Sequence, residues 1–499
     1  MFVGTGISNT FTLIELLAEL ERRKAKPATL LLIDKDPDFF KGVPYGDRSG
    51  DAGLIISKLA DFLPAAHLQP FAEWLEHNRD QAFDRFFALG GEGVETWRNA
   101  YWRDVEAGEI GELYLPRYVL GQYFEHIARR AIERAHERNV AVCETLVGEV
   151  VGLDPVDHGF TVALRDRDGR ENEVRADRVI LGLGSAPSKR ILGSRPLAVS
   201  PGCAVIEDPF DPGIADMLER IRGAARQADG APGRVLIVGS NAGALDVIFN
   251  LMNDRTIAAA IGRIDVLSTS GKLPELFHPQ PAGFRPGFVG RALKELGTHE
   301  SIVADDILDA VRQDIESARR DGFTMTDTFG DISVGFNSLL DRLSPDEKLR
   351  VARDTGPRIG ALQRKVGQDY WGVVDSLIRD GRLVVTRGRF PADAGHGEDL
   401  RAIVNCAGSG PLTDEAAPPL IRQLIERGWV RPTGSGLGMQ VNDDLETEAA
   451  GLYVIGPMLT GNVVHGDPAW NLEHCGRIAM FARRLAAHLA ERAVAELTT

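Results

Sequence analysis

The hydrophobic positions of the first 34 residues alternate between a strand pattern and a helix pattern. A continuous apolar run at residues 29–33 is typical of a parallel strand buried on both faces. Before it, leucines recur at the i, i+3, i+4 and i+7 spacing of a helix with one buried stripe: Leu13, Leu16, Leu17 and Leu20. Phe2 and Val3 are the end of a strand that is either unusually short or preceded by further residues. The segment therefore predicts strand, glycine turn, helix and strand.

A second segment of the same kind begins at residue 234. An apolar run at residues 235–238 leads into a glycine turn at residues 239–244 and then into a helical pattern. Residues 223–233 before it are rich in Ala, Gly, Asp and Pro, which is typical of a connector. Further strands are expected around residues 160–174, 178–184, 400–406 and 452–455. These alternating elements predict an α/β fold with two Rossmann-like units, the second inserted in the first.

Composition and charge narrow the class of protein. The 499 residues include 57 basic and 72 acidic side chains, a net charge of −15, and no long basic run. Binding to nucleic acid or to an anionic membrane is therefore disfavoured, because both need clustered Lys and Arg. The four cysteines lie far apart without a Cys-x-x-Cys pair, which excludes a zinc ribbon and a redox-active dithiol. We expect a cytoplasmic protein, and one without a metal, because Asp208, Asp211 and their neighbours lack a regular metal-ligand spacing.

The first glycine turn carries most of a dinucleotide fingerprint. Gly4 permits the tight turn after the strand, and Gly6 lets backbone approach a pyrophosphate at the helix N-terminus. The third glycine position is Asn9, so Ser8 and Asn9 are expected to donate side-chain hydrogen bonds to the phosphates. Asp34 ends the next strand, where a carboxylate accepts ribose hydroxyls. Strand, turn, helix and acid together favour dinucleotide binding over a chance glycine pattern.

The second glycine turn is looser. Gly239 matches the first glycine, Asn241 replaces the second, and Ala244 takes the small third place. The following strand ends at Ser268 and runs on to Lys272 without an acidic residue, which suits a 2′-phosphate and favours NADPH over NADH. The alternative is a Rossmann-like unit that no longer binds a ligand.

Two dinucleotide units in one chain suggest that a tightly held flavin accepts hydride from an exchangeable nicotinamide. We expect an FAD-binding domain formed by residues 1–200 and 396–499. Residues 201–395 are expected to form an NADP-binding domain, with a helical insertion around residues 300–380.

Several motifs, in a fixed order over nearly the whole chain, carry a family resemblance. They are residues 42–46 (GVPYG), 54–64 (LIISKLADFLP), 114–123 (YLPRYVLGQY), 273–274 with His278, 405–408 (NCAG) and 451–457 (GLYVIGP). This series resembles the FAD–NAD(P)-binding family of two-dinucleotide flavoproteins. That family is related to the flavin-dependent N-hydroxylating and Baeyer–Villiger-type monooxygenases, and some members resemble amino-acid N-oxygenases.

The resemblance implies further cofactor contacts. Tyr45 and Arg117 would lie along the flavin, Gly184 would mark the crossover between domains, and Gly456 would bring backbone near the isoalloxazine or ribityl chain. Ile56, Lys58 and Pro457 depart from residues common among the relatives.

Function follows as a set of hypotheses. The resemblance implies an FAD-dependent, NADPH-oxidising monooxygenase that uses molecular oxygen on a small polar metabolite such as an amine or amino acid. His465 and Asn471 follow the last glycine motif and are the candidate catalytic residues, although a loop histidine is more often solvated or structural. The alternatives are an NAD(P)H:acceptor oxidoreductase without oxygen insertion and a non-catalytic flavin-binding protein.

Overall fold

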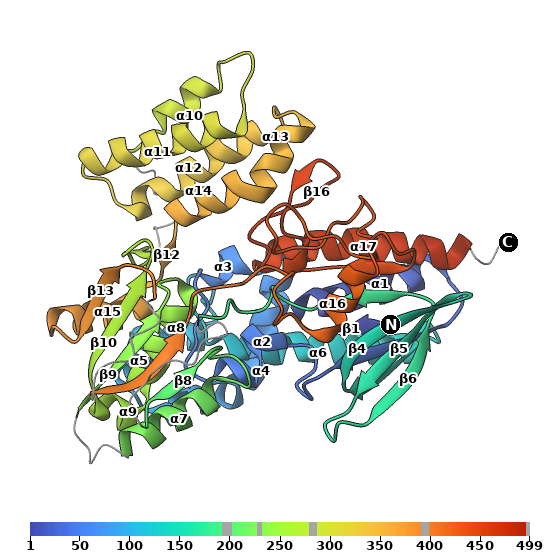
Figure 1. Ribbon diagram of the computed structural model, residues 1–499, viewed down its shortest axis with the longest axis horizontal. Helices are drawn as coiled ribbons and strands as arrows, with labels where there is room; N and C mark the ends of the chain where they lie inside the picture. The colour runs from blue at the N-terminus through green and yellow to red at the C-terminus, as the bar shows by residue number, and fades with distance from the viewer. Residues whose placement is uncertain (192–201, 227–231, 279–286, 391–398, 496–499) are drawn as a thin grey trace.

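A computed structural model describes residues 1–191, 202–226, 232–278, 287–390 and 399–495 (Figure 1). Its first sheet has five parallel strands in the order β15-β7-β1-β2-β3. The strands are β1 (Phe2–Val3), β2 (Ala28–Asp34), β3 (Ala141–Val147), β7 (Val179–Leu181) and β15 (Leu452–Val454). Although β1 has two residues, it pairs with β2 on one side and β7 on the other. The expected strand, turn, helix and strand at the amino terminus is confirmed.

Helices cover this sheet through apolar faces. They include α1 (Ile7–Arg23), α6 (Arg117–Glu137) and the closing helix α17 (Cys475–Ala495). The leucine stripe of α1 is buried, as predicted from its spacing. The apolar face of α17 is buried as well and packs against α1.

The second sheet also has five parallel strands, in the order β13-β10-β9-β14-β8. The strands are β8 (Ala204–Ile206), β9 (Gly233–Val238), β10 (Ile261–Ser268), β13 (Leu383–Arg387) and β14 (Leu400–Asn405). Its helices are α7 (Ile214–Arg226), α8 (Ala242–Asn253), α9 (Arg255–Ala260) and α15 (Gln368–Arg379). The expected return to the first domain at residue 396 is too early, because β14 pairs with β9 and β8 inside the second sheet.

Two connecting segments join the sheets and lie side by side. The chain leaves β7 through residues 182–191 and comes back through residues 406–411. An antiparallel bridge joins Ser188 to Ser409, and the Lys189 amide donates a hydrogen bond to the Gly408 carbonyl at 2.8 Å. The adjacent outgoing and returning segments confirm that the second unit is inserted in the first.

A separate helical unit lies above the second sheet in Figure 1. It consists of α10 (Arg291–Leu296), α11 (Ala304–Arg320), α12 (Met325–Leu340), α13 (Pro345–Arg350), a π-helical turn (Val351–Thr355) and α14 (Gly356–Leu362). A short parallel pair, β11 (Glu275–Leu276) with β12 (Lys365–Val366), lies at its base. The unit has its own hydrophobic core. The expected insertion to residue 380 is too long, because α15 packs against α8 of the second unit.

The remaining elements extend the first unit. A three-stranded antiparallel sheet consists of β4 (Glu149–Val156), β5 (Gly159–Arg165) and β6 (Glu171–Ala176). The additional helices are α2 (Gly42–Tyr45), α3 (Leu59–Phe62), α4 (Ala65–Leu89), α5 (Glu92–Ala107) and α16 (Pro419–Glu426). A hairpin turn at Asp166–Gly169 joins β5 to β6, within the region where strands were expected. In the described part of the chain, no helix is both long and apolar enough to cross a membrane.

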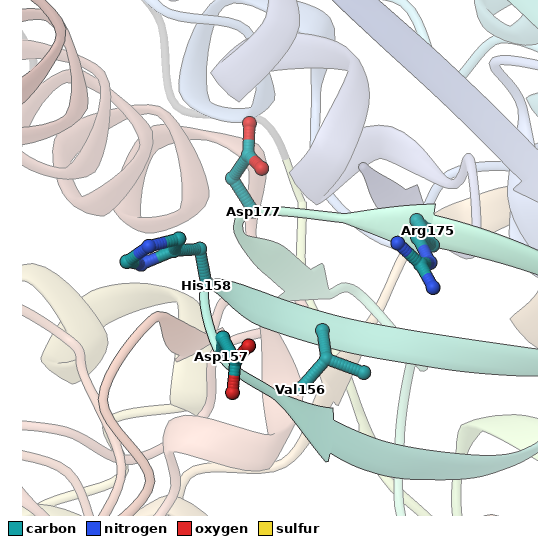
Figure 2. Close-up of a pocket in the computed structure, with 5 residues that line it drawn as sticks. All are labelled: Val156, Asp157, His158, Arg175 and Asp177. Atoms are coloured by element: carbon teal, nitrogen blue, oxygen red, sulfur yellow. The ribbon is translucent and has the colours of Figure 1, made fainter.

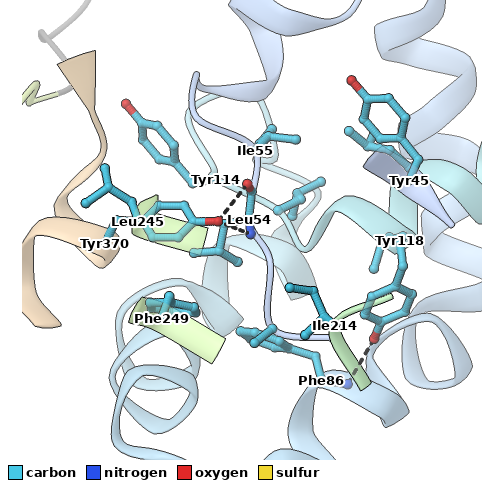
Figure 3. Close-up of a cluster of buried hydrophobic side chains, with 14 of the residues drawn as sticks. Tyr45, Leu54, Ile55, Phe86, Tyr114, Tyr118, Ile214, Leu245, Phe249 and Tyr370 are labelled. Carbon is cyan, nitrogen blue, oxygen red and sulfur yellow. Dashed lines mark hydrogen bonds between the residues drawn. The ribbon is translucent and has the colours of Figure 1, made fainter. Parts of the chain in front are cut away.

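One continuous hydrophobic core joins the two dinucleotide units (Figure 3). Leu54 and Tyr114 of the first unit contribute to it, together with Leu245, Phe249 and Tyr370 of the second unit. The Leu54 amide donates a hydrogen bond to the Tyr370 hydroxyl at 2.8 Å. The two units are therefore held together by packed side chains as well as by the two connecting segments.

Candidate functional site

The carboxyl ends of the parallel strands gather the predicted FAD residues at one edge of the first sheet. Gly4 follows β1, Asp34 ends β2 and Gly456 closely follows β15. Gly182, which was not among the predicted residues, follows β7 at the same edge. In open α/β sheets, this edge is where ligands bind. The topology therefore brings together segments that are far apart in the sequence.

The turn after β1 requires glycine and leaves the start of α1 open. Gly4 has a φ of 77°, and a Cβ there would collide with the Gly182 carbonyl. The N-cap of α1 is Gly6, with no side-chain cap and no acidic residue in the first turn. By contrast, Asp254 and Ser344 cap α9 and α13 with their own side chains. The first amides of α1 are thus available to an anion such as a pyrophosphate.

Ser8 and Gly456 meet at this helix start. Gly456 has a φ of 87°, and a Cβ on it would overlap the Ser8 hydroxyl. The described residues offer that hydroxyl no hydrogen-bond partner, although Ser8 is only 9% exposed. Ser8 is therefore free to donate to a ligand at the predicted position.

Asp34 turns its carboxylate back toward the glycine turn. Its Oδ2 accepts hydrogen bonds from the Thr5 amide at 2.6 Å and from the Thr5 hydroxyl at 2.8 Å. Its Oδ1 accepts from the Asp36 amide at 3.0 Å. Because each carboxylate oxygen accepts more than one hydrogen bond, this fixed carboxylate keeps capacity for ribose hydroxyls.

Asn9 differs from the sequence expectation. Its Nδ2 donates to the Gly4 carbonyl at 2.6 Å and to the Val3 carbonyl at 3.2 Å, and the residue is 3% exposed. Both amide hydrogens are therefore used on the backbone below the turn. Asn9 holds the turn and does not donate to a phosphate.

The loop after β2 closes over Gly6. Gly42 has a φ of 65°, and a Cβ there would collide with the Cα of Gly6. Tyr45 at the end of α2 is buried, with its hydroxyl 3.9 Å from Sγ of Cys475 at the start of α17. Burial raises the pKa of Cys475 to about 12, so this thiol stays protonated.

The second glycine turn repeats the open geometry. Gly239 has a φ of 111°, and a Cβ on it would collide with the Cys406 carbonyl at the end of β14. Asn241 is the N-cap of α8 without a side-chain cap, and the first turn of α8 has no acidic residue. Ala244 is fully buried, as its small third position requires. Gly184 lies outside this turn, exposed with a φ of 78° where β7 runs into the connecting segment.

Hydroxyls and cations follow the next strand of this unit. Oγ of Ser268 accepts a hydrogen bond from the Gly271 amide at 3.0 Å and lies 3.2 Å from Oγ of Ser270. Lys272 is exposed beside them. Arg387, which the sequence interpretation missed, is exposed and pairs in register with Ser268. Only the pairing of β13 with β10 reveals this second cation.

Arg117, which is predicted to lie along the flavin, forms an ion pair with the second dinucleotide unit. A nitrogen of its guanidinium lies 2.9 Å from Oδ2 of Asp246 on α8, and both side chains are buried. The Tyr370 hydroxyl also contacts the Asp246 carboxylate. Nε of Arg117 has no hydrogen-bond partner. This polar group ties the first dinucleotide unit to the second inside the shared core.

His465 and Asn471 flank a loop that anchors the helical unit. Both are exposed and have a φ of 49°. Between them, Trp470 is buried in the core of the helical unit, with its ring 5.6 Å from that of Phe336. Asn471 lies against Gly360 of α14. The loop at residues 465–471 therefore attaches the helical unit to the first dinucleotide unit, and we call it the strap. A catalytic role for His465 or Asn471 stays a prediction.

Glu473 and His474, which the sequence interpretation also missed, precede α17 and lie where this helix start comes close to α3 and β12. We call this place the junction. The His474 ring packs edge-on against Phe62 of α3 at 5.6 Å, and burial lowers the pKa of His474. Burial raises the pKa of the neighbouring Glu473 carboxyl. His474 also senses the charges of Asp61 and of Lys365 from β12. Because these residues come from segments far apart in the sequence, no motif spacing predicts that they meet at this junction.

A cavity of about 470 Å³ lies elsewhere, on the antiparallel sheet (Figure 2). Its lining residues are Val156, Asp157, His158, Arg175 and Asp177. They come from the β4–β5 turn and the end of β6, away from both glycine turns. Within the described ranges, His, Cys, Asp and Glu side chains do not group in threes as a metal site would require.

The paired Rossmann units and their open glycine turns define a two-dinucleotide flavoprotein fold. Residues 1–186 match the family described as FAD-NAD(P)-binding, which confirms the resemblance drawn from the motifs. The chain thus carries an FAD-NAD(P)-binding domain at its amino terminus. It is also 29% identical to an uncharacterized protein of Mycobacterium tuberculosis, over 98% of this chain and 94% of the relative.

Solved structures share the fold over the whole length. The reduced form of ornithine hydroxylase from Pseudomonas aeruginosa has a TM-score of 0.52 at 15% identity, with 98% of both chains covered. L-lysine 6-monooxygenase from Pseudomonas syringae has a TM-score of 0.50 at 15% identity, with 99% of both covered. Ornithine N-hydroxylase from Kutzneria sp. 744 has a TM-score of 0.50 at 14% identity, with 98% of both covered. At such identities the likeness shows a shared fold.

Proposed function

We propose that the protein is an FAD-dependent, NADPH-oxidising monooxygenase that acts on a small polar metabolite such as an amine or amino acid. The observation that carries the proposal is the pair of uncapped helix starts, each preceded by a turn whose glycine has a positive φ, in two packed Rossmann units. The whole-length likeness to amino-acid hydroxylases adds support.

The residues present fit the two cofactors. Gly4, Ser8 and Asp34 would hold the pyrophosphate and ribose of FAD, with Gly456 close to its flavin end. Ser268 and Lys272 would hold the 2′-phosphate of NADPH. When bound, FAD supplies the hydride acceptor and activates molecular oxygen.

The chain itself supplies positioning and a water-poor site. The core that contains Leu54, Leu245 and Tyr370 fixes the two units, so the dinucleotides would be held in one relative orientation. Tyr45 and Phe62 place buried aromatic surface beside the start of α17, which excludes water from that end of the crevice.

An NAD(P)H:acceptor oxidoreductase without oxygen insertion is the second candidate. A dithiol relay is disfavoured, because the four cysteines are unpaired and burial raises the pKa of Cys143 to about 11 and of Cys475 to about 12. Low thiol pKa values are what such relays need. An acceptor that takes electrons directly from the flavin fits the same fold, so turnover has to separate the two.

The test starts with the purified protein. We expect a yellow protein whose absorption is bleached by NADPH under anaerobic conditions. In air, an added amine or amino acid should raise NADPH consumption without an equal release of peroxide. Peroxide release that equals NADPH consumption with every added compound would favour the second candidate. A colourless protein that does not take up added FAD would end the proposal.

A matched pair of variants connects this test to the glycine turns. Gly4→Ala places a Cβ against the Gly182 carbonyl, so FAD should be lost. Gly169→Ala is the control: its φ of 79° is similar, but nothing lies within 4 Å of the added Cβ. Only the first variant should be colourless.

A further inference from the structure

Lys365 stands where the second dinucleotide unit meets the helical unit. It opens β12, and its ammonium lies 3.8 Å from the ring centroid of Phe277 and 3.6 Å from that of Phe329. Phe277 follows β11, and Phe329 lies on α12. The two rings contact each other edge-on at 5.6 Å, so they form a two-sided aromatic cage around the ammonium.

The cage gives the ammonium no counter-ion. Within the described residues, no carboxylate lies within 4.0 Å of the Lys365 nitrogen, and none of its three N–H groups has a hydrogen-bond acceptor. Burial lowers the pKa of Lys365 to about 8, with Lys58 acting in the same direction and Asp61 opposing them. Buried charges are normally paired. Lys365 is therefore a cation with unused donors and little compensation.

The start of α17 lies near Lys365. Burial is the main reason that the pKa of His474 is lowered, and the Lys365 charge acts in the same direction, so the ammonium and the imidazole lie near each other. Arg477, one turn further on, stacks on Trp470 at 4.5 Å. Burial lowers the pKa of Arg477, and Glu473 opposes that effect. Two cations, Lys365 and Arg477, thus lie near the His474 imidazole at the junction.

We propose that Lys365 anchors an anionic group, a carboxylate, of the molecule that reacts at this junction. The proposal rests on the proposed function and deepens it: the substrate is a carboxylate-bearing amine such as an amino acid, and a simple amine binds poorly. A carboxylate accepts two or three hydrogen bonds from the free N–H groups of Lys365 and supplies the missing charge. The aromatic cage holds the ammonium in place before the carboxylate arrives.

A purely structural role makes a different prediction. If Lys365 only joined Phe277 to Phe329, a ligand would not change its accessibility. If its anion were a phosphate of the nicotinamide cofactor, NADP⁺ alone would cover it. These two alternatives are outcomes of the same experiment.

The experiment acylates the holoenzyme with an N-hydroxysuccinimide ester and reads each lysine by peptide mass spectrometry. We expect succinate and L-ornithine to slow acylation of Lys365 at least 5-fold, while putrescine, which lacks a carboxylate, leaves it unchanged. Lys294, exposed on α10 of the same helical unit, is the internal control and should react at one rate throughout. Absence of protection by both carboxylates would overturn the proposal, as would protection by NADP⁺ alone.

Two variants extend the test to turnover. Lys365→Met keeps the stem and removes the charge, and it should raise KM for a carboxylate-bearing substrate at least 10-fold with a smaller change in kcat. Lys365→Arg should restore most of the affinity, and Lys294→Met should change nothing. Unchanged KM in Lys365→Met would refute the anchor. If NADPH bleaches the flavin normally but carboxylates do not protect Lys365, the anchor proposal is refuted and the proposed flavoenzyme function stands. If carboxylates protect Lys365 but NADPH does not bleach the protein, the proposed function is refuted and the anchor stands.

Discussion

Replacing Asp246 by Asn should destabilise the protein strongly, because it leaves the Arg117 guanidinium buried without a counter-charge. The guanidinium and the carboxylate are 2.9 Å apart, with side-chain exposures of 14% and 4%. At an effective dielectric constant of about 20, their attraction is roughly 6 kcal/mol, much of which offsets the cost of burying both charges. Removing one partner of such a pair costs about 3–5 kcal/mol.

The Asp354–Arg358 pair is a matched control. Its charged atoms are also 2.9 Å apart, but its side chains are 61% and 45% exposed, so Asp354→Asn should cost about 0–1 kcal/mol. Urea unfolding followed by circular dichroism measures both changes. The double variant Arg117→Met, Asp246→Leu should recover much of the loss, because it leaves no unpaired charge. Equal costs for the two Asp→Asn changes would refute the account of a buried, uncompensated guanidinium.

Four further outcomes follow from single contacts. Gly456→Ala should abolish flavin binding, measured by absorption, because its added Cβ meets the Ser8 hydroxyl at a φ of 87°. Trp470→Ala should destabilise the docked helical unit by about 3–5 kcal/mol, measured by urea unfolding. Lys272→Gln should weaken NADPH binding roughly 10-fold in fluorescence titrations and leave NADH binding unchanged, since a phosphate contact is worth about 1–2 kcal/mol. Acylation of Lys365 should rise with pH around a midpoint of about 8, because only the neutral amine reacts, and a midpoint near 10 would contradict the effect of burial.

Local chemistry made the two glycine turns predictable. The signals of each unit, namely a strand end, a glycine turn and a helical pattern, lie within about 30 consecutive residues. Both Rossmann units could therefore be predicted from the sequence. Asn9 shows where this reasoning stops. A polar residue in a phosphate turn can face either the ligand or the backbone beneath it. Asn9 faces the backbone, because its side-chain amide donates to the carbonyls of Val3 and Gly4.

Other features depend on pairings between distant segments. The apolar run of β14 identified a strand, but an apolar run does not say which of two parallel sheets it joins. Arg387 comes beside Ser268 only through the register of β13 with β10. Arg117 and Asp246 are 129 positions apart and meet because two cores merge. Hydrophobic periodicity carries no information about any of these encounters.

This division corresponds to a division of labour in the molecule. The residues that would hold cofactors lie in turns immediately after strands, so each dinucleotide unit forms its own cofactor site from local sequence. Lys365 lies on β12, its two aromatic neighbours come from α12 and from the residue after β11, and charged groups of α3 and the start of α17 lie nearby. These parts meet because Trp470 packs the loop before α17 into the core of the helical unit. A chain of this fold can therefore keep its cofactor turns while the helical unit and its strap change the charge at the junction. Substrate choice then depends on how three parts pack, and the under-compensated ammonium of Lys365 is the clearest sign of what this junction accepts.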